Sequence, residues 1–170
     1  LIRVERMLNL DPESQLIASI LSKKLAVGSK YILLDIPYGE DVKVNLHQAE
    51  KLKKYFLRMA RYFKLKMKVV LTDGSQPIGN AIGPVLEIID IYKILKRESP
   101  PRDLEEKSIF LASLILEMMG KAKKGKGKEL AKEILDSGRA LKKFEEIIDA
   151  QGRKKFSLKL AKYRRDIVAK

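Results

Sequence analysis

Two largely apolar runs limit most strongly what this chain can fold into. "YILLDI" occupies residues 31–36 and "MKVVLT" residues 67–72, and both have the length of a strand. Continuous apolar runs are typical of strands buried on both faces, as in parallel sheets. The segment between them, about 45–63, is predicted to form a helix whose inward face carries Ala49, Leu52, Tyr55, Phe56, Met59 and Ala60. This strand–helix–strand order predicts parallel strands joined by a right-handed crossover.

Helical patterns fill most of the remaining sequence. Residues 11–27 carry an apolar stripe, with Asp11 as a good N-cap, Pro12 at the first helical position and Gly28 at the stop. Further helices are predicted at about 79–95, after "SPPRD", and at about 127–137 and 138–150. We therefore expect an α/β fold: part of a mostly parallel sheet with flanking helices and a helical second half. Because two strands make a poor sheet, we expect partner strands upstream.

The predicted organisation is a partial central α/β domain over residues 1–152, followed by a basic segment, 153–170, that leads towards a C-terminal domain. The chain starts with Leu beside a patterned segment, which indicates a fragment. No signal-peptide pattern is present, and no run approaches the roughly 20 apolar residues of a membrane span. A soluble, cytoplasmic protein without a membrane partner is expected.

Composition excludes several kinds of site. Without Cys there is no disulfide, thiolate nucleophile or Cys-based zinc site, and the single histidine, His47, rules out multi-His metal sites. Abundant Lys and Glu with few Asn and Gln indicate adaptation to heat. The net charge of +14 suits either a heat-adapted surface or a polyanion-binding module. Since the lysines are interleaved with Glu and Leu and no RNA-binding aromatic motif occurs, we do not expect nucleic acid as the partner.

Polar segments follow both predicted strands. They are "DIPYGEDVK" after the first and "TDGSQPIGNAIG" after the second, and open α/β sheets bind ligands at these carboxyl ends. The glycines of the second segment favour tight turns. Asp73 and Ser75 are expected to cap the next helix, and Gln76 could line the cleft. The chain has neither a Walker loop nor a G-x-G-x-x-G motif.

Two longer stretches resemble a known family. "ASILSKKLAVGSKYILLDI" and "VVLTDGSQPIGNAIGPVLEI" are similar to the thymidine and pyrimidine nucleoside phosphorylases, in which a Ser-x-x-x-Lys helix precedes an apolar strand ending in Asp. The resemblance runs in order over residues 9–152. "KKLAVGSKYILLDIPYGEDVKV" is closer to the archaeal branch of the family, which acts on AMP.

The resemblance implies a glycosyltransferase of the nucleoside phosphorylase/phosphoribosyltransferase catalytic-domain type. It would convert AMP, or another nucleoside monophosphate such as CMP or UMP, and phosphate into free base and ribose 1,5-bisphosphate. Inorganic phosphate is a co-substrate, and no cofactor or metal is expected. The full-length protein is expected to form a homodimer or a higher homo-oligomer.

The resemblance also implies roles for Ser19 and Lys23, which stand four residues apart on one helix face. Ser19 matches the serine that hydrogen-bonds the base, and Lys23 matches the lysine that contacts the pyrimidine. The alternatives are a small polar residue near the helix surface for Ser19 and a solvated helix lysine for Lys23.

Asp11 and Lys43 complete the implied site. Asp11 matches the proton donor of the AMP-cleaving branch, although an engaged N-cap would keep it ionised. Lys43 matches a ligand-contacting lysine, with an ordinary loop lysine as the alternative. Either Arg3 or Arg6 could contact substrate, and their spacing does not choose between them. His47 matches no catalytic position of the family.

The family's phosphate-binding glycine loop and its helical dimerisation domain precede the matched segment. A chain of residues 1–170 alone would therefore lack the phosphate site and be inactive. Two alternatives remain open: a phosphorylase of thymidine or other pyrimidine nucleosides, and, from another class, a basic nucleic-acid-binding module.

Overall fold

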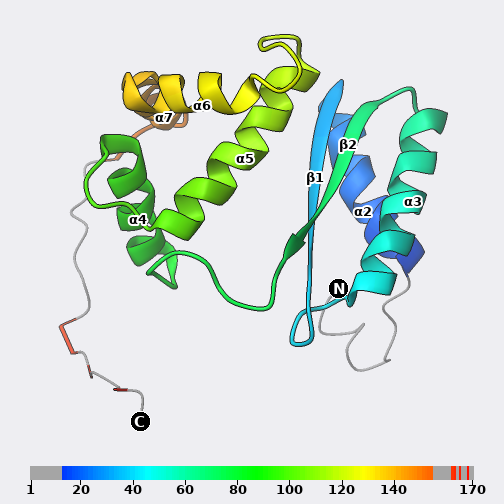
Figure 1. Ribbon diagram of the computed structural model, residues 1–170, viewed down its shortest axis with the longest axis horizontal. Helices are drawn as coiled ribbons and strands as arrows, with labels where there is room; N and C mark the ends of the chain where they lie inside the picture. Colours follow the sequence, from blue (N-terminus) through cyan, green and yellow to red (C-terminus); the bar gives the residue numbers. More distant parts are fainter. Residues whose placement is uncertain (1–12, 155–161, 164, 166–167, 169–170) are drawn as a thin grey trace. The chain divides into compact units, whose positions relative to one another are not determined.

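The computed structural model describes residues 13–154, 162–163, 165 and 168, and it divides into two compact units (Figure 1). Unit 1 comprises residues up to Pro77 together with Leu114–Lys124, and unit 2 comprises Ile78–Ser113 and the residues from Gly125 onwards. The elements in chain order are α2 (Glu13–Ala26), β1 (Tyr31–Tyr38), α3 (Leu46–Tyr62), β2 (Lys66–Asp73), α4 (Pro84–Lys96), α5 (Arg102–Met118), α6 (Gly127–Asp136) and α7 (Arg139–Ala150). The boundary between the units falls within α5.

The sheet of unit 1 consists of β1 and β2, which pair in parallel from Tyr31 opposite Lys66 to Tyr38 opposite Asp73 (Figure 1). Both predicted strands are confirmed, each extended at its carboxyl end by one or two residues. The helix between them supplies the crossover that parallel strands require. The prediction of an α/β fold with flanking helices and a helical second half is confirmed.

The core of unit 1 lies between one face of the sheet and the two helices α2 and α3. Asn45 caps α3 in a capping box with Gln48, which fixes where the helix starts. Phe56 is 1% exposed and is the largest fully buried side chain among the described residues. Tyr55 was predicted to face inwards but is 39% exposed, because the buried stripe of α3 passes through Ala49, Leu52, Phe56 and Ala60.

Unit 2 begins with a longer loop than the sequence predicted, and α4 starts at Pro84 rather than near residue 79. The prediction that Asp73 and Ser75 cap this helix is wrong. The Asp73 carboxylate instead accepts a bond from the Ser75 backbone N–H at 2.8 Å, which forms a local turn. Gly79 and Gly83 have positive φ angles, so the chain turns there before Pro84 sets the first helical turn.

Carboxylates hold that loop in place. The backbone N–H groups of Gly79, Asn80 and Gly83 donate to side chains of Asp103, Asp90 and Glu87, respectively. Asp90 is 3% exposed, and its burial is offset because it accepts both this bond and a contact from Lys93. Sequence periodicity could not show these long-range bonds.

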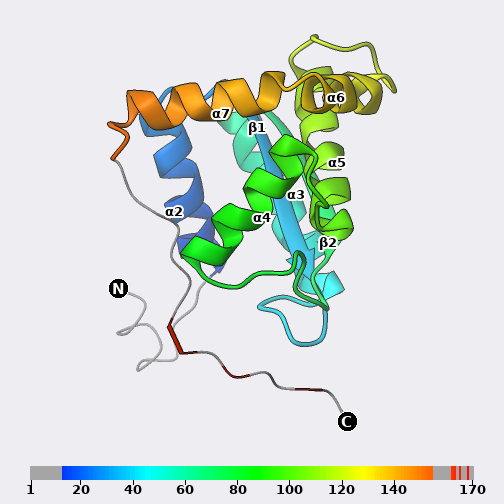
Figure 2. The same cartoon turned by 90° about the vertical axis from the view of Figure 1, so that its left-hand side faces the viewer.

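The helices of unit 2 pack through α7, which is seen side-on in Figure 2. It contacts α6 and α4, and the rings of Tyr92 on α4 and Phe144 on α7 meet edge to face at 5.7 Å. Tyr92 also donates to the Glu145 carboxylate at 2.8 Å, and Arg153 forms an ion pair with that same carboxylate. No residue of α7 is buried, and these polar contacts add to the ring contact in its attachment.

Among the described residues, no helix is both long and apolar enough to cross a membrane. The predicted boundary at 152/153 stays a prediction, since most of residues 153–170 lie outside the described part of the chain.

Candidate active site

The predicted base-binding pair is on the exposed side of α2. Ser19 and Lys23 are both exposed, and the Lys23 Nζ donates to the Ser19 Oγ at 3.0 Å. The core side of the same helix carries Ile17 and Leu21, which lie roughly opposite them on the helical wheel. The structure thus brings the two residues together on an open helix face.

The bond between these side chains has a chemical consequence for Ser19. A hydroxyl has one proton to donate and two lone pairs to accept with. Because the Lys23 ammonium occupies one of those lone pairs, the Ser19 proton can be donated to an acceptor on a ligand. The ammonium keeps two further N–H donors for the same ligand.

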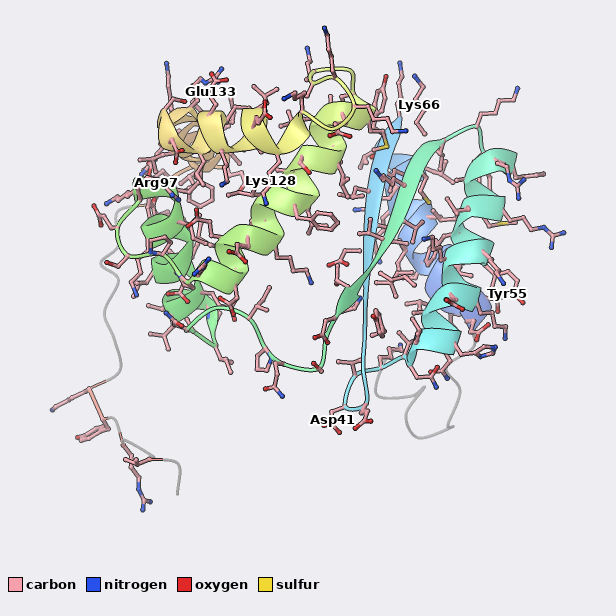
Figure 3. All side chains as sticks on the ribbon, viewed as in Figure 1. Asp41, Tyr55, Lys66, Arg97, Lys128 and Glu133 are labelled. Atoms are coloured by element: carbon pink, nitrogen blue, oxygen red, sulfur yellow. The ribbon has the colours of Figure 1, made fainter. Side chains whose placement is uncertain are left out.

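Lys43 is positioned by the loop between β1 and α3. It is exposed and lies two residues beyond Asp41, whose place at the carboxyl end of β1 is visible in Figure 3. The loop is closed by the Gly39 N–H, which donates to the Val44 carbonyl at 3.2 Å. Lys43 therefore belongs to a different element from the Ser19–Lys23 pair.

Two glycines let this loop approach the turn after β2. A Cβ atom at Gly74 would lie 2.9 Å from the Pro37 side chain, and one at Gly39 would lie 3.1 Å from the Ser75 backbone nitrogen. Real Cβ atoms essentially never lie as close as the first distance, and the second is tighter than nine in ten real Cβ contacts, so both glycines favour the close packing of the two carboxyl-end segments. The two polar segments that follow the strands thus lie against each other.

Two carboxylates at this end of the sheet have hydrogen-bond partners. Asp35 accepts from the Thr72 hydroxyl at 2.7 Å, on the sheet face opposite the α2–α3 core. Bonds from the Ser75 side chain and backbone lower the pKa of Asp73. The link between Asp35 and Thr72 was missed from the sequence, although both residues occur in the matched motifs; Gln76 is exposed beside this turn.

An ion pair joins the starts of α2 and α3. Lys51 Nζ lies 3.0 Å from the Glu13 carboxylate, and the hydrogen bond and charge of Glu13 raise the pKa of Lys51. Asp11, the predicted proton donor, lies outside the described residues, as do Arg3 and Arg6. The conflict between the cap and proton-donor roles of Asp11 therefore stays open.

A large groove lies elsewhere, between α2 and α3, with a volume of about 870 Å³. Its walls are mostly apolar and include Ile17, Leu21, Leu25, Tyr55, Met59 and Phe63. Neither the Ser19–Lys23 pair nor Lys43 lines it. His47 is exposed in the first turn of α3. Over residues 13–154 and the few described beyond them, no three His, Cys, Asp or Glu side chains are grouped so as to hold a metal ion.

Comparison with known proteins gives relatives along nearly the whole chain. A "Putative thymidine phosphorylase" of Ralstonia nicotianae is 48% identical over 171 residues, which is 99% of this chain and 34% of the relative. AMP phosphorylase of Methanococcus maripaludis is 42% identical over 174 residues, again 99% of this chain and 34% of the relative. The chain is homologous to these phosphorylases. It spans about a third of their length. No family model matches it.

A further relative, from Bradyrhizobium sp. (strain BTAi1), is also named "Putative thymidine phosphorylase" and is 51% identical over 154 residues. That match covers 89% of this chain and 30% of the relative. The resemblance carried by the Ser19–Lys23 helix and the two strands therefore agrees with the names of these relatives.

Proposed function

We propose that the full-length protein is an AMP phosphorylase, which converts AMP and phosphate into adenine and ribose 1,5-bisphosphate. The observation that carries this proposal is the 42% identity with AMP phosphorylase of Methanococcus maripaludis over 99% of this chain. CMP and UMP are further candidate substrates. Phosphorolysis needs a donor to the departing base, cations for the phosphate groups and exclusion of water.

Ser19 and Lys23 are assigned to the base. Negative charge develops on the base as the glycosidic bond breaks, and donors aimed at that charge stabilise the transition state. The Ser19 hydroxyl, already accepting from Lys23 at 3.0 Å, has its proton available for a base acceptor. Lys23 adds positive charge beside that acceptor.

Asp11 is assigned as the proton donor to the base, and Lys43 as a contact to the nucleotide. A carboxyl group can serve as general acid when a secluded pocket raises its pKa. The Lys43 ammonium is a compact charge suited to a phosphate group or a base acceptor. Its loop is held at the carboxyl end of β1, where α/β sheets bind ligands.

The second candidate is a phosphorylase of thymidine or other pyrimidine nucleosides. It is favoured by the names of several relatives that are 48% to 51% identical to the chain. A Lys at position 23 also suits the carbonyl of a pyrimidine.

Substrate turnover by the full-length protein separates the two candidates. With phosphate present, release of adenine from AMP supports the first, and release of thymine from thymidine supports the second. If neither base is released, the phosphorylase assignment fails. In that case, binding to RNA whose affinity falls steeply with salt concentration would instead favour a nucleic-acid-binding module.

Variants test the individual roles in the full-length enzyme. Ser19→Ala should lower kcat/KM about 10- to 100-fold, since a hydrogen bond to a charged group contributes roughly 1.5–3 kcal/mol. Ser22→Ala on the same helix is the matched control and should leave kcat/KM within about twofold, because Ser22 bonds only the Ser19 carbonyl. An equal loss in both variants would remove Ser19 from the site.

Asp11→Asn should lower kcat far more than it raises KM, because the amide cannot donate the acid proton. Lys43→Ala should chiefly raise KM for the nucleotide, with Lys54→Ala on α3 as the control of equal charge. If Asp11→Asn changes only the melting temperature, Asp11 is a helix cap rather than a proton donor.

The proposal includes a homodimer or a higher homo-oligomer, measurable by light scattering, and no activity for residues 1–170 alone. It also includes a heat-adapted archaeal source, since Cys is absent and Lys and Glu are abundant. A melting temperature typical of mesophilic proteins would contradict that last part.

A further inference from the structure

A hollow at the amino-terminal end of the sheet in unit 1 lies away from the predicted active-site residues. This amino-end pocket has a volume of about 400 Å³ and is lined by the end of α2, by Lys30 and Tyr31, and by Phe63–Lys66. Figure 3 shows Lys66 at the end of the sheet opposite the loop that contains Asp41. Eight-residue strands separate the two ends by roughly 25 Å.

The charges around the amino-end pocket are all of one sign. Lys30, Lys64 and Lys66 line it, and within the described part of the chain no carboxylate pairs with any of them. The sequence explains this, because residues 51–72 contain eight basic side chains and no acidic one. Residues 14–34 likewise contain three lysines and no acid. Such a hollow concentrates positive potential and attracts anions.

Two of the polar groups are already fixed in place. Lys66 Nζ donates to the Tyr31 hydroxyl at 3.3 Å and lies 5.0 Å from the centre of the Tyr31 ring. This cation–π contact holds the ammonium at the pocket. The Tyr31 hydroxyl, which accepts from Lys66, keeps its own proton to donate to an anion.

Lys64 reaches the pocket through an unfavourable backbone conformation. Its φ is 53°, in the left-handed region, at the end of α3. The end of α2 has the same pattern of two backbone bonds, but there the left-handed residue is Gly28, with φ of 67°. Glycine adopts this region freely, whereas a side chain makes it costly. The chain therefore keeps a cationic side chain at a position that glycine would fill with less strain.

Helix ends alone do not account for this much charge. The carboxyl ends of α2 and α3 point here, and each carries about half a negative elementary charge. The three lysines lining the pocket bring three positive charges, and Lys24 and Arg61 lie in the last turns of the two helices. A net positive charge remains after the helix ends are neutralised.

We propose that the amino-end pocket binds a polyphosphate anion, that is, a di- or triphosphate group. Its volume suits a small ligand. Three ammonium groups and a phenol match the several oxygens of such a group. The group could be inorganic or carried by a nucleotide, and the half-exposed ring of Phe63 gives a nucleotide base a surface to stack on. This site is separate from the proposed AMP site.

Calorimetric titration of the full-length protein with inorganic tripolyphosphate and with ATP tests the proposal. The double variant Lys30→Gln/Lys66→Gln should weaken tripolyphosphate binding at least 30-fold. The control Lys54→Gln/Lys132→Gln removes the same charge elsewhere and should weaken it less than threefold. Equal losses in both double variants, or no binding at millimolar tripolyphosphate, would overturn the proposal.

The comparison of ligands identifies the source of the phosphate group. ATP binding at least tenfold tighter than tripolyphosphate, with the excess removed by Phe63→Ala, supports a nucleotide. Equal affinities support inorganic polyphosphate. A third outcome is that single-stranded RNA displaces tripolyphosphate and that both double variants weaken RNA binding equally. This result would indicate a general polyanion-binding surface and would contradict a defined pocket.

Two further variants separate this pocket from helix capping and from the active site. Lys64→Gly should raise the melting temperature and yet weaken tripolyphosphate binding at least fivefold; unchanged affinity would overturn the proposal. Lys43→Ala should leave tripolyphosphate affinity unchanged, because it lies at the other end of the sheet. If Lys43→Ala abolishes the binding, tripolyphosphate occupies the proposed nucleotide site instead.

Discussion

The two units of the chain balance their charged side chains differently. Residues 13–77 and 114–124, in unit 1, contain fifteen basic and seven acidic side chains. Residues 78–113 and 125–154, in unit 2, contain thirteen basic and twelve acidic side chains. Unit 2 uses its charges in internal ion pairs, whereas much of the positive charge of unit 1 is left for solvent or a ligand.

The ends of α3 and α4 show this difference at single residues. Both helices end at a cationic residue in the left-handed region, Lys64 with φ of 53° and Arg97 with φ of 63°. Arg97 forms ion pairs with Glu105 at 2.7 Å and Asp136 at 3.0 Å, whereas no carboxylate of the described chain meets Lys64. The same left-handed backbone conformation thus carries an ion-paired side chain in unit 2 and a lysine without a carboxylate partner among the described residues in unit 1.

The units also differ in what holds their helices. In unit 1, the core around Phe56 joins α2, α3 and the sheet. In unit 2, the attachment of α7 includes the bond between Tyr92 and Glu145 and the ion pairs of Arg153. Unit 1 should therefore respond most to loss of apolar volume, and unit 2 to loss of charge.

The largest expected effect is in the core of unit 1. Phe56→Ala should lower the free energy of unfolding by about 3–5 kcal/mol, since it leaves a cavity where a fully buried ring was. Phe110→Ala on α5, where the ring is 43% exposed, is the control and should change it by about 0.5 kcal/mol or less. Urea denaturation followed by circular dichroism measures both. Similar losses in the two variants would contradict the assignment of Phe56 to the buried core of unit 1.

The next effect compares the two left-handed helix ends. Arg97→Ala should lower the free energy of unfolding by about 1–2 kcal/mol, because the Glu105 side chain, 15% exposed, loses its partner. The loss stays below that of a fully buried pair because Arg97 is 39% exposed. Lys64→Ala keeps the same backbone strain and breaks no ion pair, so urea denaturation should show almost no change. If Lys64→Ala lowers the free energy of unfolding as much as Arg97→Ala does, the two helix ends do not differ in their ion pairing as described.

A smaller effect of opposite sign is expected for glycine at the same two positions. Lys64→Gly should raise the free energy of unfolding by about 0.5–1 kcal/mol, because glycine relieves the left-handed strain without loss of a contact. Arg97→Gly gains the same relief but loses both ion pairs, so it should remain destabilised. Thermal unfolding distinguishes them by the direction of the shift. If Lys64→Gly is destabilised, the lysine side chain makes a stabilising contact within unit 1.

Local chemistry explains why much of the fold could be predicted from the sequence. The apolar runs at 31–36 and 67–72 and the stop at Gly28 depend on neighbouring residues only, and the structure confirms them. The start of α4 depends on bonds from the loop to Asp90 and Asp103, which lie 10 and 24 residues away from their partners. No short-range pattern contains that information.

For the candidate site, the sequence predicted that Ser19 and Lys23 share one face of a helix, because a helix places residues four apart on one face. The hydrogen bond between their side chains was seen only in the structure. The acid-free run 51–72 was equally visible in the sequence. The sequence did not show that Lys64 and Lys66 from this run line one pocket together with Lys30, because the fold brings them together at the amino end of the sheet.

The smallest expected effect is the pH response of the α7 attachment. The ion pair with Arg153, together with the bond from Tyr92, lowers the pKa of Glu145. A carboxyl whose folded-state pKa is lowered stabilises the fold above its unfolded pKa, which is about 4.3, and this stabilisation is lost as the pH falls through the folded pKa. The melting temperature of unit 2 should therefore fall as the pH drops below about 4.5.

Glu145→Gln should reduce that acid dependence, because its side chain does not titrate. Glu106→Gln removes a carboxylate from an exposed pair on α5 and serves as the control of equal charge. Melting curves between pH 3 and pH 7 should become flatter in the first variant and keep their slope in the second. Equal flattening in both variants would indicate a response to net charge. In that case the polar attachment of α7 would not distinguish unit 2 from unit 1.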